Sequence, residues 1–210
     1  MSEVIEVNLS KDDCKEYTYW SDYMKVWKES AAWEVNDAGY LDLSRTKRNE
    51  VNKSIREGFR SIELPWDSEI MVSRTDFLQD IYEVNTSMDY RQGKPLGDSY
   101  KVFPKRMTNK KKCNQHHSRF IACIFDKKLV AYITANFCGE IAAASQIMGH
   151  GAWLDRGIMA NIWLRFMEIV ANESPCKYII YSRWDDGFEG LKQWKKSVGM
   201  RPVILKEKAL

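Results

Sequence analysis

The chain has 210 residues, a formal net charge of +3, and 44% hydrophobic residues. A chain of this length and composition is typical of a globular protein with a substantial buried core. The composition argues against a largely disordered chain, and the charge is too mildly basic to indicate a class of partner.

The cysteines argue against a disulfide-stapled scaffold. Their number is odd and no pair has a CxxC spacing, which fits a reducing compartment better. They are Cys14, Cys113, Cys123, Cys138 and Cys176. The N-terminus shows no basic region followed by an apolar run, and no apolar stretch approaches the roughly 20 residues that cross a bilayer. We therefore expect a cytoplasmic protein with no membrane association.

The N-terminal segment predicts a strand followed by a helix. Residues 3–9 alternate between apolar and polar side chains, as a half-buried strand does. Ser10 is suited to cap a helix over residues 11–32. Apolar residues recur in that helix at helical spacing and predict a buried stripe: Tyr19, Tyr23, Val26 and Trp27.

A basic amphipathic helix is expected over residues 44–60, after a short strand at 40–43. Val51, Ile55 and Phe59 repeat every four residues, and six Lys and Arg residues share the same segment. This pattern fits two interpretations. The helix has either a solvated basic face above an apolar underside or a surface for an anionic partner.

The middle of the chain combines a short predicted helix with a long turn-rich segment. Residues 76–84 are expected to be helical, and Gly and Pro residues then punctuate residues 85–100. A loop of this length inside a compact domain is often functional. A second basic run covers residues 101–112.

The C-terminal half predicts the element order β-β-β-α-β-α-β. The expected elements lie at 120–125, 129–138, 141–148, 157–171, 177–181, 187–198 and 200–205. A strand, a crossover helix and a further strand imply a parallel pair. The fold class is therefore α+β or α/β, with a mixed sheet flanked by helices.

The most informative stretch is QIMGHG, residues 146–151, at the end of a predicted strand. Asp155, Arg156 and Gly157 open the helix that follows. Unpaired amides and the dipole at a helix N-terminus favour a pyrophosphate, glycines allow close approach of a ligand, and Arg156 can neutralise a phosphate. Such a turn is also common as a plain structural feature. Its position between a three-strand meander and a strand–helix–strand unit favours the functional interpretation.

This order of elements resembles the GNAT fold, and QIMGHG matches the Q/R-x-x-G-x-G/A acyl-CoA motif of that superfamily. The resemblance covers roughly residues 115–205. YEVNTSMDYRQGKPLGDSY and CNQHH with the strands after it resemble a group of GNAT-like proteins of bacteria and phages. SRTKRNEVNKSIREGF is similar to a helix of FemAB-type aminoacyltransferases, which are built on the same fold. We expect one GNAT-like domain over 1–210, in which 1–114 shapes the acceptor site and 115–205 forms the acyl-CoA-binding core.

The resemblance implies a splayed sheet, in which the strand at 141–148 separates from the strand at 177–181. The thioester arm would insert between these strands, and free backbone groups there would polarise the thioester carbonyl. The implied contacts with acetyl-CoA or another acyl-CoA are Ile147, Met148, Gly149, Gly151, Arg156, Gly157 and Ile158. No metal is implied.

Two departures from the superfamily pattern bear on mechanism. The glycine motif ends several residues before the helix start, so the pyrophosphate is expected at 155–158, with Asp155 as the helix cap. In the last helix, KKSVGM has Lys195 where many members have a Tyr general acid. Tyr181 or water would then protonate the leaving thiolate, or the thiolate leaves unaided.

An amine nucleophile is helped by a base with a pKa near 7. The candidate catalytic residues are His150, Tyr181, Asp185, Asp186 and Glu189. Asp185 and Asp186 follow a strand at its carboxyl end, where ligands gather in open α/β sheets. Plain alternatives are a solvated histidine and an Asp-Asp-Gly turn. Arg91 and Gln92 are expected to bind the acceptor.

Three functions remain open from the sequence. The first is an N-acyltransferase that moves an acetyl or similar group from a coenzyme A thioester to an amine. The second is a phage-type enzyme, working in the host cytoplasm, that acylates or aminoacylates an amine of a modified nucleobase and binds DNA through residues 45–60 and 101–112. The third is a non-catalytic GNAT-fold module that binds nucleic acid or protein. A zinc site at Cys113, His116 and His117 is not predicted, because no fourth ligand is recognisable.

Overall fold

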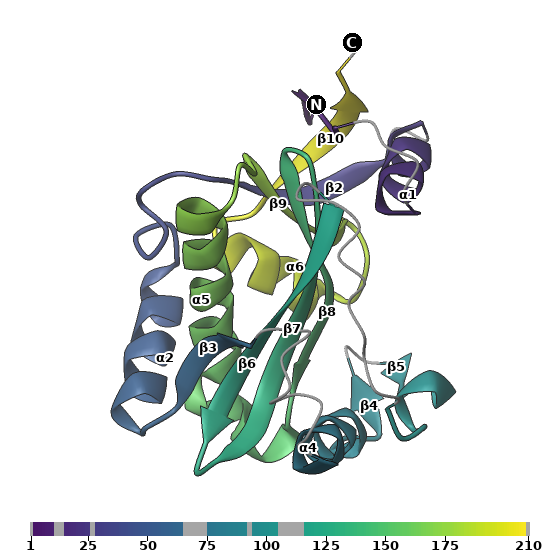
Figure 1. Ribbon diagram of the computed structural model, residues 1–210. Helices are drawn as coiled ribbons and strands as arrows, with labels where there is room; N and C mark the ends of the chain where they lie inside the picture. The colour runs from purple at the N-terminus through teal and green to yellow at the C-terminus, as the bar shows by residue number, and fades with distance from the viewer. Residues whose placement is uncertain are drawn as a thin grey trace.

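An eight-stranded mixed sheet forms the centre of the molecule (Figure 1). The computed structural model describes residues 2–10, 15–25, 28–64, 75–91, 94–104 and 116–208. The strand order is β1-β10-β2-β9-β8-β7-β6-β3. The strands are β1 (Glu3–Val7), β2 (Glu29–Glu34), β3 (Arg60–Leu64), β6 (His116–Phe125), β7 (Lys128–Cys138), β8 (Ile141–Gly149), β9 (Tyr178–Arg183) and β10 (Arg201–Glu207). Neighbours are antiparallel except for the pairs β1–β10 and β8–β9.

Helices cover both faces of this sheet. On one face lie α2 (Arg45–Arg56), α5 (Ile158–Glu173) and α6 (Glu189–Ser197), and α2 and α5 run side by side (Figure 1). On the other face lie α1 (Lys15–Met24) and α4 (Thr75–Thr86). The smaller elements are the hairpin of β4 (Tyr90–Arg91) and β5 (Lys94–Pro95) and the 3-10 helices η1 (Asp98–Tyr100) and η2 (Gly151–Arg156).

The largest part of the core lies between the sheet and α5. This helix is apolar on nearly all sides because it is enclosed by the sheet and α2, as a helix with buried residues all round must be. Its one buried amide, Asn161, donates from Nδ2 to Ser54 Oγ at 3.0 Å and to Phe59 O at 3.3 Å. These bonds satisfy the polar group and tie α5 to α2.

The C-terminal order β-β-β-α-β-α-β is confirmed, as are the mixed sheet and its helical flanks. β6, β7 and β8 form the predicted meander, and α5 crosses from β8 to the parallel strand β9. The prediction succeeded here because each strand has a long apolar run and each turn has glycine or charged residues.

The predicted helix over 11–32 is wrong in its second half. α1 ends at Met24, and residues 29–34 form β2, a strand between β10 and β9. Ala31, Ala32 and Trp33 are buried on both faces, so this strand shows a continuous apolar run rather than alternation. Burial in the sheet centre therefore overrides the helix propensity of alanine. Val26 and Trp27, two residues of the predicted stripe, lie outside the described residues.

The strand predicted at 40–43 is also wrong. These residues form turns, and the carbonyls of Leu41 and Leu43 accept hydrogen bonds from Arg48 Nη1 at 3.0 and 2.9 Å. The helix predicted over 44–60 ends at Arg56, and Arg60 opens β3, which pairs with β6. Ser44 caps α2 by accepting from Lys47 N at 3.3 Å.

Cys123, Cys138 and Cys176 are buried in the core, while Cys14 and Cys113 lie outside the described residues. In the part of the chain that the structure describes, every helix is too short or too polar to cross a membrane.

Candidate functional site

β8 and β9 pair at one end and separate at the other. Their register runs through Ile141↔Tyr178, Ala142↔Ile179 and Ala143↔Ile180, and it ends there. β8 continues to Gly149 and β9 to Arg183, so a gap opens between the two strands. The splayed sheet expected from the resemblance is therefore present.

Two bulges lie where this gap begins. In the β7–β8 ladder Thr134 pairs with Gln146 and Ala135 with Ala144, which leaves Ser145 as an extra residue. In the β2–β9 ladder Ser30 pairs with Arg183 and Ala32 with Ile180, so β9 also carries an extra residue. Ser182, next to this irregularity, has a φ of 50°, in the left-handed region. Bulges bend the strand that carries them, so these two account for the separation of β8 from β9.

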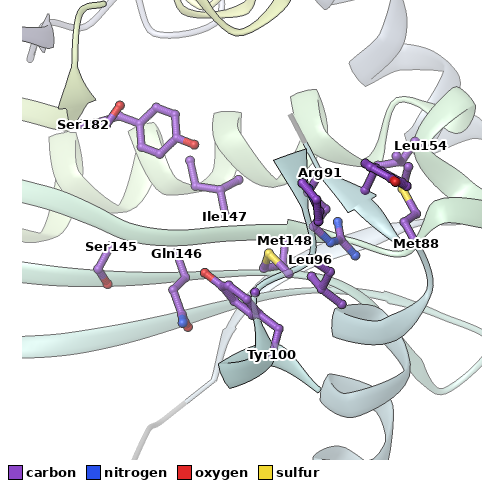
Figure 2. Close-up of a pocket in the computed structure, with 14 residues that line it drawn as sticks. Met88, Arg91, Leu96, Tyr100, Ser145, Gln146, Ile147, Met148, Leu154 and Ser182 are labelled. Atoms are coloured by element: carbon purple, nitrogen blue, oxygen red, sulfur yellow. The ribbon is translucent and has the colours of Figure 1, made fainter. Parts of the chain in front are cut away.

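Three pockets meet at the gap, and Tyr181 of β9 lines all of them. The arginine pocket, about 480 Å³, lies under β4, β5 and η1 and contains Arg91 (Figure 2). The carboxylate pocket, about 340 Å³, lies between α2, η2 and α6 and contains Glu50 and Asp155. The aromatic pocket, about 420 Å³, is bounded by Tyr19, Trp20 and Tyr23 of α1. Ile147 is shared by the arginine and carboxylate pockets, which open on opposite faces of the sheet.

The free edge of β8 directs backbone groups into the gap. His150 N donates to Val130 O of β7 at 2.8 Å. Alternate residues of a strand turn their N–H and C=O groups to opposite sides, so Met148 faces β7 and Ile147 and Gly149 face the gap. Met148 pairs with Tyr132 in the ladder. The amide that best fits an oxyanion role is therefore that of Ile147 rather than that of Met148.

Tyr181 is held at the gap by aromatic packing from the helices beneath it. Its ring lies 6.3 Å from that of Trp163 in α5 and 5.7 Å from that of Trp194 in α6. Lys195 Nζ lies 5.8 Å from the centre of the same ring. The rigid support on two sides fixes the position of the phenol relative to β8.

Arg91 holds the far end of β8. Its Nη1 donates to Gly149 O at 3.0 Å, and its Nη2 donates to Val84 O and, at 3.2 Å, to Ser87 Oγ. Burial lowers the pKa of Arg91, because the charged guanidinium loses hydration there. Figure 2 shows Arg91 at one end of the pocket and Ser145, Gln146 and Ser182 at the other. Gln92, the second residue predicted for the acceptor site, lies outside the described residues.

The amides at the C-terminal end of the glycine motif are not free. Gly151 N donates to Ser87 Oγ at 2.9 Å, and Ala152 N donates to His150 Nδ1 at 3.2 Å. The inserted η2 separates the motif from α5, so local partners occupy these donors.

The start of α5 is closely packed. Gly157, with a φ of 75°, caps the helix, and a Cβ at this position would lie 2.2 Å from Glu50 O. Asp155, the expected cap, instead pairs with Arg156 at 3.5 Å, and Arg156 also pairs with Glu57 at 3.3 Å. Ile158, an expected contact of the cosubstrate, is fully buried in the core. The role predicted for these residues in binding a pyrophosphate stays a prediction, and their contacts in the structure do not favour it.

Among the other candidate catalytic residues, His150, Asp185 and Glu189 line none of the three pockets. His150 caps η2 through Nδ1. Asp185 pairs with Lys192 at 3.3 Å, and Glu189 accepts from Gln193 at 2.7 Å, both on the surface. Asp186 borders the aromatic pocket but pairs with Arg183 at 3.6 Å. Of the residues predicted for catalysis, Tyr181 is the one that lines the pockets on both faces of the sheet.

Lys195 has a structural role that its place in the superfamily pattern did not suggest. It is fully buried, and its Nζ donates to the carbonyls of Arg183, Trp184 and Asp186. Burial lowers its pKa, although Asp186 and Asp185 act in the opposite direction. The ammonium closes the turn after β9 and so fixes the end of the strand that carries Tyr181.

The basic segment 45–60 is not one continuous free surface. Lys47 pairs with Glu50 at 2.7 Å, Arg48 binds two carbonyls, and Lys53 Nζ donates to Asp155 O at 2.9 Å. Arg45, Arg56 and Arg60 are exposed. Most of the second basic segment, 105–112, lies outside the described residues. Among the residues that are described, no group of three or more His, Cys, Asp and Glu side chains is placed to hold a metal ion.

Comparison with solved structures finds proteins that share the fold of this chain. FemX superposes with a TM-score of 0.56 at 9% identity, over 84% of this chain and 59% of that one. The C-terminal DUF2156 domain of a presumed lysylphosphatidylglycerol synthetase from Agrobacterium fabrum superposes with a TM-score of 0.54 at 12% identity. The match covers 84% of this chain and 58% of that one. L-PGS from Bacillus licheniformis superposes with a TM-score of 0.52 at 12% identity, over 84% of this chain and 59% of that one.

These likenesses show a shared fold, and the chain spans less than three fifths of the length of each of these structures. No protein-family model and no curated protein matches the chain. The fold is thus a mixed sheet flanked by helices, and the chain shares it with FemX and the synthetase domain.

Proposed function

We propose that the chain transfers an acyl or aminoacyl group from an activated ester or thioester to an amine, inside the gap between β8 and β9. The observation that carries the proposal is the combination of a free strand edge at Ile147 with a supported tyrosine, Tyr181, on the opposite strand. Pockets on both faces of the sheet reach this point, so a donor and an acceptor can approach from opposite sides.

The chain's residues suit three roles in such a transfer. The Ile147 amide can stabilise the oxyanion that forms when the amine attacks the donor carbonyl carbon. The C–O or C–S bond then breaks as the new C–N bond is completed. The Tyr181 hydroxyl can protonate the leaving oxygen or sulfur, while the proton of the amine passes to solvent. No other residue predicted for catalysis lines the arginine or the carboxylate pocket, which supports Tyr181 for this role.

An aminoacyl ester is the donor that the charges favour. Glu50 and Asp155 line the carboxylate pocket with Lys47 as the one cation among the lining residues. Carboxylates attract an α-ammonium group and repel a pyrophosphate. The synthetase whose domain shares this fold is named for attaching a lysyl group, which supports the same class of donor.

A coenzyme A thioester is the second candidate. The backbone groups of Ile147 and Gly149 face the gap, and an extended amide-bearing arm can pair with such an edge as an added strand does. The occupied amides of Gly151 and Ala152 count against tight binding of its phosphates.

Thermal melting with each donor tests the proposal. We expect a hydrolysis-resistant aminoacyl-adenosine ester analogue to raise the melting temperature at millimolar concentration, because a ligand that binds only the folded state stabilises it. A rise with acetyl-CoA instead would identify the thioester as donor. If neither compound shifts the melting temperature, and neither donor yields an acylated amine by mass spectrometry, the chain is not a transferase of this type.

A further inference from the structure

The arginine pocket holds a positive charge without a compensating negative one. Arg91 is the one charged side chain in its lining, and the others are apolar or neutral polar groups such as Tyr100, Ser145 and Gln146. Among the residues that the structure describes, no carboxylate forms an ion pair with Arg91. Its hydrogen-bond acceptors are two carbonyls and a hydroxyl, all neutral.

Arg91 is half-buried, and the loss of hydration makes its charge costly. Arg91 Nε is buried and has no hydrogen-bond partner, and desolvation is the main cause that lowers the pKa of the side chain. A buried cation is ordinarily paired, because the interior solvates it poorly. The carbonyl bonds hold the guanidinium in place but leave its charge uncompensated, and one Nη1 hydrogen has no acceptor among the residues that the structure describes.

The position of Arg91 relates it to the reaction site. It binds Gly149, which lies two residues beyond Ile147 on β8, so the separation along the strand is about 7 Å. Ile147 and Gly149 face the same gap. An acceptor held at Arg91 by one end can therefore present a group a few bonds away to the carbonyl carbon beside Ile147.

We infer that the arginine pocket binds an acceptor amine that also carries an anionic group, a carboxylate or a phosphate, with the anion on Arg91 and the amine toward Ile147. This inference rests on the proposed function for the direction of the amine. The binding of the anion is independent of it. A guanidinium recognises both anions by charge-assisted hydrogen bonds.

Binding is measured without any donor, by thermal melting at fixed ionic strength. The probes are β-alanine and O-phosphoethanolamine, and their neutral counterparts are β-alaninamide and ethanolamine. We expect the anionic probes to raise the melting temperature by about 3 °C at ten times their dissociation constant, and the neutral amines to leave it unchanged. A shift with one anionic probe alone assigns the carboxylate or the phosphate as the group bound.

Matched variants locate the effect. Arg91→Met should abolish the shift, whereas Arg56→Met, which removes an exposed charge from α2, should preserve it. Ser87→Ala removes the three hydrogen bonds that Ser87 Oγ makes with Val84, Arg91 and Gly151 and leaves the charge of the pocket unchanged. It should therefore lower stability and keep the preference for anions. Should Arg91→Met not fold, Gln146→Glu places a carboxylate in the same pocket and should abolish the shift.

The inference is overturned if the anionic probes give no shift, if the neutral amines stabilise as well as the anionic ones, or if folded Arg91→Met or Gln146→Glu responds as the parent does. If a donor binds and is consumed but the anionic probes give no shift, this inference alone is wrong and the proposed function stands. Anionic probes that bind while no donor does would remove the proposed function and leave the anion site.

Discussion

The two pockets that open on opposite faces of the β8–β9 gap differ in charge. The arginine pocket has a cation and no carboxylate in its lining, and the carboxylate pocket has two carboxylates and one lysine. They share Ile147 and Tyr181, so the difference lies in what surrounds a common centre. Under the proposed function, the shared centre would carry out the transfer step and the outer walls would select the two substrates.

The two pockets also differ in how firmly their walls are fixed. The carboxylate pocket is bordered by the start of α5, where Gly157 touches the backbone of α2. The wall of the arginine pocket is the small hairpin of β4 and β5, joined to β8 by Arg91. Changes near the first should act on the stability of the whole domain, and changes near the second on binding.

The largest effect is expected from Gly157→Ala. The positive φ and a Cβ 2.2 Å from Glu50 O force either the helix start or α2 to move. We expect the free energy of unfolding to fall by about 2–4 kcal/mol, measured by urea denaturation. Gly190→Ala is the matched control, because a Cβ added there meets no atom within 4 Å. This change should raise stability by about 0.5–1 kcal/mol. Equal effects of the two changes would contradict the close packing at the helix start.

Tyr181→Phe tests the shared centre. Loss of the hydroxyl should lower kcat by about 100-fold, the lower end of the range for a general acid, with little change in KM for the donor. The ring packing is kept, so the melting temperature should change by at most about 3 °C. Glu189→Gln, on the surface of α6, should keep full activity. Full activity of Tyr181→Phe would exclude its hydroxyl from the reaction.

Glu50→Gln tests the charge difference between the two pockets. The change removes one carboxylate and frees Lys47, with which Glu50 pairs at 2.7 Å. We expect KM for an aminoacyl ester to rise about fivefold, corresponding to about 1 kcal/mol for a partly exposed charge. For a coenzyme A thioester the same change should lower KM. The direction of the change, read from steady-state kinetics, therefore separates the two donors.

The smallest effect concerns Cys176, at the paired end of the same strands. Burial raises the pKa of its thiol from 9.0 to about 11. The folded state then retains a proton that the unfolded state loses, so this contribution to stability is complete below pH 9.0 and declines as the pH rises toward about 11. At pH 8 alkylation of Cys176 should be slow and should accelerate in urea, as measured by peptide mass spectrometry. Rapid native labelling would indicate that the paired end opens as well.

The sequence predicts the second half of this fold well and the first half poorly. β6 to β10 and their helices follow strong local patterns, whereas β2 carries alanines that favour a helix until the sheet encloses them. β3 is not predicted from the sequence because three of its five residues are charged or polar. Nothing local in RSIEL indicates the partner strand β6, which lies far along the chain.

The candidate site divides in a similar way. Tyr181 and the strand end at Ile147 can be found from the order of elements and the motif, since both depend on neighbours in sequence. The charge of Arg91 and its place beside Gly149 depend on a contact across 58 positions. The Ser145 and Ser182 bulges leave no sequence signal, because serine is an ordinary strand-end residue and only the ladder reveals the extra position.

The sequence by itself determined the meander, the crossover helix and the mixed sheet, because hydrophobic period and turn residues act over short stretches of chain. Tertiary structure alone decided that β8 and β9 part, that the amides of Gly151 and Ala152 are already bonded, and that carboxylates line one pocket and an arginine the other. Those features arise from contacts between segments distant in sequence, whose register, burial and charge neighbours no local pattern encodes.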